Sequence, residues 1–72
     1  MTKYRVTFNN PMYEEIWIIE DENLRATIQN QMSGAGYVEI MATNWRSKER
    51  CLLMFNPKNF SSVEIREVAG NE

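Results

Sequence analysis

The apolar run Ile16-Trp17-Ile18-Ile19 constrains the fold of this chain more than any other feature. Successive side chains of a strand point to opposite faces, so this run predicts a strand over residues 13–20 that is apolar on both sides. The chain has 72 residues, which we interpret as a single domain over 1–72 near the lower size limit for independent folding. Both faces of this strand must pack against other apolar side chains. So short a chain has few elements that could cover both faces.

Four further segments show an alternation of apolar and polar residues, or a short apolar run, that predicts a strand. They cover residues 3–9, 37–45, 50–55 and 63–68. Most of the segments between them are rich in Asn, Pro, Gly or charged residues, which favour turns and loops. Residues 69–72 are expected to form a frayed tail.

One helix is predicted between the second and third strands. Residues 21–23, Asp-Glu-Asn, offer a capping side chain and acidic groups for the positive end of the helix dipole. Leu24, Ile28 and Met32 recur every four residues and form one apolar stripe, and the glycines at 34 and 36 favour the end of the helix. The chain therefore predicts an α+β fold, a small antiparallel sheet in the order β-β-α-β-β-β with one helix packed on one face.

A single helix covers one face of a sheet, yet large apolar residues point to both faces at 16–19 and again at 52–55. The second cover comes either from curling of the sheet into a partial barrel or from another copy of the chain. We expect a homodimer, because association is a common remedy for an undersized core.

The residues that usually carry catalysis are missing or badly placed. The chain has no histidine, and its one cysteine, Cys51, falls at a position expected to face the core, where it would be inert. The acidic pairs and triplets at 14–15 and 20–22 fit strand surface and helix start, and they lack the spacing of a calcium loop. We therefore predict no catalytic residues, no metal site, no cofactor and no enzymatic activity.

The loop after the third strand is the one candidate binding site. Asn44, Trp45, Arg46, Lys48 and Arg50 place a large aromatic ring beside three cations, which suits a base, a phosphate or an acidic protein surface. The alternative is that Trp45 packs on the sheet edge and the cations only solubilise the hairpin. Further side chains on the first two strands are expected to add surface to this site: Tyr4, Arg5, Tyr13 and Trp17.

The net charge of −2 and a pI of about 5.1 disfavour a protein that relies on long-range attraction to nucleic acid. We predict a small non-enzymatic protein that binds a protein partner and occupies its surface, as an inhibitor or adaptor. Phage-encoded inhibitors provide the analogy, and residues 56–65 are similar in composition to small phage accessory domains. The alternative is a binder of a nucleotide or of single-stranded nucleic acid through Trp45 and the neighbouring Arg and Lys residues.

The expected location is the cytoplasm. A lone cysteine suits a reducing compartment, and the first residues lack the apolar run of a signal peptide. The longest apolar runs are far shorter than the roughly 20 residues that span a bilayer, so no membrane association is expected.

Overall fold

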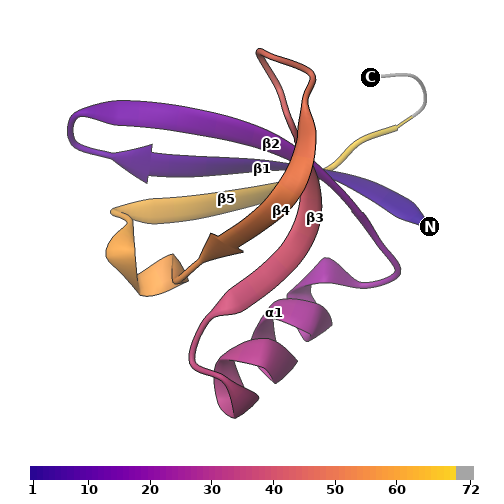
Figure 1. The fold of residues 1–72 in the computed structure, drawn as a ribbon, viewed down its shortest axis with the longest axis vertical. Helices are drawn as coiled ribbons and strands as arrows, with labels where there is room; N and C mark the ends of the chain where they lie inside the picture. Colours follow the sequence, from indigo (N-terminus) through magenta and orange to yellow (C-terminus); the bar gives the residue numbers. More distant parts are fainter. Residues whose placement is uncertain (70–72) are drawn as a thin grey trace.

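The computed structural model describes residues 1–69 and has the predicted α+β fold, a five-stranded antiparallel sheet with one helix on one face (Figure 1). Of the predicted tail, residues 70–72 lie outside the described part. The elements follow the expected order β-β-α-β-β-β, with a short 3-10 helix before the last strand. They are β1 (Thr2–Asn10), β2 (Tyr13–Asp21), α1 (Leu24–Gly34), β3 (Val38–Asn44), β4 (Arg50–Phe55), η1 (Pro57–Asn59) and β5 (Ser62–Glu67).

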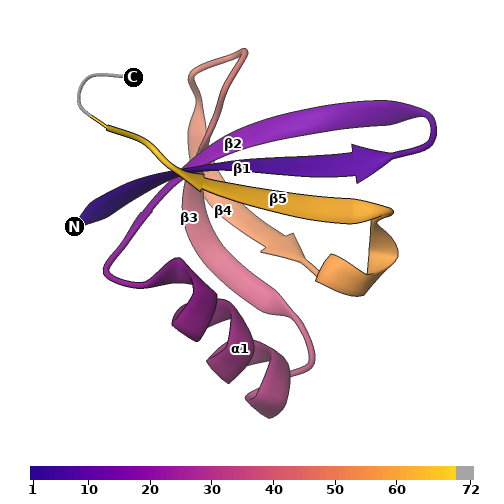
Figure 2. The same ribbon diagram turned by 180° about the vertical axis from the view of Figure 1, so that it is seen from behind.

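The strands lie in the order β4-β3-β2-β1-β5, and the junction between β2 and β3 is short. β1 and β2 are paired along their whole length, whereas β2 and β3 are opposite each other only at Trp17↔Asn44 and Ile18↔Thr43. Figures 1 and 2 show the result: β1, β2 and β5 run across the view, and β3 and β4 cross them at a steep angle. The sheet therefore bends into two halves that curl toward each other.

Aromatic contacts close the two halves around the core. The ring of Phe8 in β1 lies with its centroid 4.8 Å from that of Phe55 in β4 and 5.0 Å from that of Phe60, which follows η1. Curling of the sheet thus buries the inner face, the same face on which the helix packs. It does not supply the predicted cover for the second face, where Met41, Leu52 and Met54 are exposed. The buried apolar side chains are Val6, Phe8, Trp17, Ile19, Leu24, Val38, Ala42 and Phe55.

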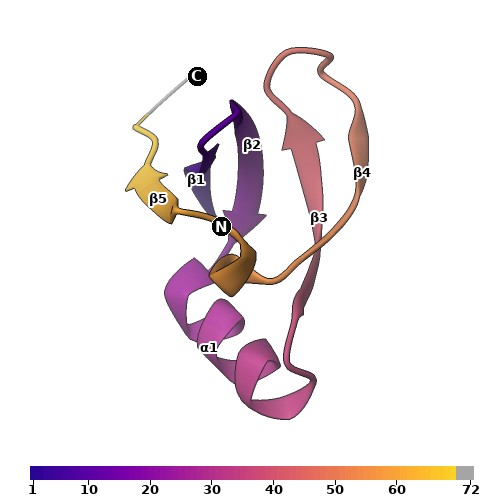
Figure 3. The ribbon, with the colours of Figure 1, turned by 90° about the vertical axis from the view of Figure 1, so that its left-hand side faces the viewer.

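The cap and the end of the helix are as the sequence predicts, but the first turn holds no acidic residue, because Asp21 and Glu22 precede the cap. The side-chain oxygen of Asn23 accepts a hydrogen bond from the Ala26 amide at 3.2 Å, and Leu24 is fully buried. At the other end Gly36 has a φ of +81°, a conformation that favours glycine. Figure 3 shows α1 below the sheet beside the first residues of β3. There the Gln31 side chain donates to the Glu39 carbonyl at 3.2 Å and accepts from its amide at 2.7 Å.

Cys51 differs from the prediction. It lies opposite Ala42 on the inner face, as its place in the alternation indicated, but its side chain is exposed. β4 is the last strand on its side of the sheet, and α1 packs beside the first residues of β3, so the thiol remains uncovered. The expected burial of Cys51 is wrong, and the expectation of an inert thiol loses its basis.

Candidate functional site

The side of the sheet that faces away from the core is the candidate site, called here the outer face. Directly opposite residues of paired strands point to the same side, so the strand registers define its members. These are Lys3, Arg5, Thr7 and Asn9 of β1; Glu14, Ile16, Ile18 and Glu20 of β2; Glu39, Met41 and Thr43 of β3; Arg50, Leu52 and Met54 of β4; and Ser62, Glu64 and Arg66 of β5. The helix lies on the opposite side, so the outer face is open.

One line of directly opposite residues crosses all five strands. It runs Arg66, Arg5, Ile18, Thr43, Arg50, and we call it the arginine row. Within the described residues, no hydrogen bond or ion pair involves the Arg50 or Arg66 side chain. These two guanidinium groups are therefore available to an external carboxylate or phosphate.

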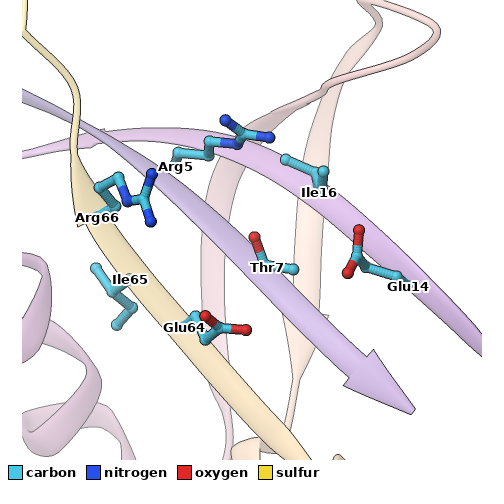
Figure 4. Close-up of a pocket in the computed structure, with 7 residues that line it drawn as sticks. All are labelled: Arg5, Thr7, Glu14, Ile16, Glu64, Ile65 and Arg66. Atoms are coloured by element: carbon cyan, nitrogen blue, oxygen red, sulfur yellow. The ribbon is translucent and has the colours of Figure 1, made fainter. Parts of the chain in front are cut away.

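A shallow depression of about 480 Å³ lies beside the row on the β1–β2–β5 half (Figure 4). Arg5 and Arg66 lie at one end of it and Glu14 and Glu64 at the other, with Thr7 between them. Asn9 donates a hydrogen bond to the Glu64 carboxylate at 2.7 Å and thereby fixes that side chain. The depression combines both signs of charge, and this combination suits a protein surface better than a polyanion.

The loop that joins β3 to β4 is an ordered turn built by Asn44. Its side-chain oxygen accepts from the amides of Arg46 at 2.9 Å and Ser47 at 3.0 Å, and its carbonyl accepts from the Lys48 amide at 3.0 Å. Lys48 has a φ of +64°, which closes the turn. Asn44, which was predicted as a binding residue, therefore has a structural role and holds the loop in shape.

Trp45 is half-buried and contacts two cations. The guanidinium carbon of Arg5 lies 4.9 Å from the centroid of the indole ring, and the Lys48 ammonium lies 4.5 Å from it. Both distances are within the range of cation–π attraction. Two cations therefore contact the Trp45 ring at the edge of the outer face. An incoming base would have to compete with these cations for the ring surface.

The structure brings the predicted site residues together only in part. Trp45, Arg46 and Lys48 share the loop, whereas Arg50 lies on β4 at the end of the arginine row. Sequence reasoning missed Arg66, because its place beside Arg5 depends on a pairing between the first and last strands. Trp17, which was expected to add surface, is buried in the core.

Exposed apolar side chains form a second feature of the outer face, on its β3–β4 half. Met41 is 43% exposed and lies opposite Leu52, which is 51% exposed. Met54, 58% exposed, is two residues further along β4 and opposite Glu39. Arginine and apolar side chains grouped in this way are typical of protein interfaces.

Among residues 1–69, no three His, Cys, Asp or Glu side chains lie close enough together to hold a metal ion, and α1 lacks the length and apolar character of a membrane-spanning helix. Comparison with models of protein families, with curated proteins and with solved structures found no match.

Proposed function

We propose that this protein is a non-enzymatic binding protein that occupies the surface of a protein partner with the outer face of its sheet, as an inhibitor or adaptor. The observation that carries the proposal is the arginine row beside exposed Met41, Leu52 and Met54. Arginines and apolar side chains that become buried together on binding are typical of protein–protein interfaces. The helix leaves this face open to a partner. The expected partner offers carboxylates to the arginines and apolar side chains to the β3–β4 half.

The charge pattern favours a protein over a nucleic acid. Most of the chain's cations lie on the outer face or its loop, namely Lys3, Arg5, Arg46, Lys48, Arg50 and Arg66. The same face also carries four exposed carboxylates, at Glu14, Glu20, Glu39 and Glu64. A phosphate backbone would meet these acids wherever it left the arginine row, whereas a protein surface can match both signs of charge.

The nucleotide or single-stranded nucleic acid of the alternative proposal would use Trp45 as a stacking plane. Arg5 and Lys48 already contact that ring, so stacking would require at least one of these cations to move. Binding of a labelled single-stranded oligonucleotide, with steep weakening as salt rises, would favour this alternative over the protein partner.

We also propose that the protein is a homodimer and works in the cytoplasm. Exposed apolar residues on β4 support association with a second copy. The exposed thiol of Cys51 supports a reducing compartment, because outside one it would be open to disulfide exchange.

A charge-reversal pair tests the proposed binding face. Arg46→Glu with Arg66→Glu changes one exposed cation of the outer face and one of the loop beside it, and Arg25→Glu with Lys58→Glu makes the same change of charge on α1 and η1. Immobilised wild type and both variants are compared for the protein partner that each captures from a lysate, after circular dichroism has shown equal folding. We expect the outer-face variant to lose at least about tenfold in affinity for the captured partner and the control variant to retain it. Equal affinity in both variants would refute the proposed face.

A further inference from the structure

The two edges of the sheet are chemically different. The free edge at β5 carries alternating charges, Glu64, Arg66 and Glu67, a pattern that discourages pairing with another strand. The free edge at β4 has the sequence Arg-Cys-Leu-Leu-Met-Phe, with one charge at its start and no proline. An apolar edge strand of this kind is a template for a further strand.

The backbone of β4 is oriented for such pairing. The Asn44 amide donates to the Glu49 carbonyl at 2.9 Å, so this pair is hydrogen-bonded in the antiparallel ladder. Hydrogen-bonded and non-hydrogen-bonded pairs alternate along the ladder, so Arg50, Leu52 and Met54 direct their amides and carbonyls away from β3. The same three residues have their side chains on the outer face.

We propose that β4 pairs antiparallel with β4 of a second copy about a two-fold axis at Leu52, giving a dimer with one continuous sheet. The inference rests on the homodimer proposed above and fixes its interface. In this register Leu52 lies opposite the partner's Leu52, and Met41 flanks each of them, so four apolar side chains form the central line. The two-fold axis is perpendicular to the sheet, so both outer faces look the same way and form one extended binding face.

Charge complementarity selects this register. Arg50 lies opposite the partner's Met54, whose neighbour on β3 is the partner's Glu39, so an arginine and a glutamate flank one methionine at each end of the interface. A shift of the axis to Leu53 would place Arg50 opposite the partner's Asn56 and take it away from that glutamate. A shift to Cys51 would pair only residues 50–52 of β4, and it would place two thiols directly opposite each other.

Single cysteines distinguish the three registers. Directly opposite residues of a hydrogen-bonded pair have Cα atoms about 5.5 Å apart, within disulfide range, whereas a two-residue offset puts them beyond about 7 Å. The wild type, Cys51→Ser with Leu52→Cys, and Cys51→Ser with Leu53→Cys are oxidised mildly and analysed on non-reducing gels. We expect rapid disulfide-linked dimers from the Leu52→Cys protein and at least about tenfold slower cross-linking in the other two. Preferential cross-linking through position 51 or 53 would overturn the Leu52 register.

Light scattering tests the interface in the absence of cysteine substitutions. We expect the wild type to have a dimeric mass, and Leu52→Lys, which places like charges opposite each other, to weaken dimerisation by roughly tenfold or more. Met12→Lys adds the same charge in the β1–β2 turn, at a side chain that is 88% exposed, and should leave the dimer intact. A monomeric wild type at millimolar concentration would overturn the dimer, and equal effects of the two lysine substitutions on dimerisation would overturn its interface.

The binding of a protein partner to the outer face is measured separately with the charge-reversal pair, so the two proposals can fail independently.

Discussion

Replacing Phe8 by leucine tests whether contacts between the two halves of the sheet hold the fold closed. Phe8 is 2% exposed, and its ring contacts those of Phe55 and Phe60. Leucine keeps most of the apolar burial but removes both ring–ring contacts, each of which contributes about 0.5–1.5 kcal/mol. We therefore expect Phe8→Leu to lower the free energy of unfolding by about 1–3 kcal/mol. Phe60→Leu, which removes one of the two contacts at a half-buried position, should cost about half as much.

The loss of unfolding free energy expected for Phe8→Leu is a large fraction of the total, because a domain of 72 residues has a stability of only about 4–11 kcal/mol. Alanine at position 8 would cost about 3–5 kcal/mol and could unfold the protein outright, so leucine is the informative change. Urea denaturation followed by circular dichroism gives the free energies, with all variants at one protein concentration because dimerisation adds to stability. An effect of Phe8→Leu no larger than that of Phe60→Leu would refute the central role of Phe8 in closing the sheet.

Three further substitutions test local features of the structure. Gly36→Ala should destabilise the protein by about 1–2 kcal/mol because the residue has a φ of +81°, whereas Gly34→Ala, in the last turn of α1 with open space around it, should stabilise by up to about 1 kcal/mol. Thermal melts measure the change in stability of both variants. Stability changes of the same sign for Gly36→Ala and Gly34→Ala would contradict the left-handed conformation of Gly36. Asn44→Ala removes two hydrogen bonds that order the loop and should cost about 1–2 kcal/mol. Faster hydrogen exchange at the Arg46 and Ser47 amides is the expected signature, and unchanged exchange would show that the loop does not depend on Asn44.

Local sequence patterns are enough to predict the strands and the helix of this protein. Alternation of apolar residues at Val6 and Phe8, and the stripe that begins at Leu24, are local patterns, and they predicted the burial of these three side chains. The helix cap at Asn23 and the positive φ at Gly36 are equally local. Elements of this kind could be predicted because each depends on residues within a few positions of one another.

Which side chains meet across the sheet depends on how the strands pair in the folded protein. A period of two assigns a residue to a face but says nothing about its neighbour on the next strand, so the pairing of Arg5 with Arg66 was beyond the reach of the sequence pattern. The exposure of Cys51 has the same origin, since it follows from the place of β4 at the sheet edge and of α1 beside β3. The arginine row exists because strands distant along the chain come together in one register, and that register depends on how the whole core packs.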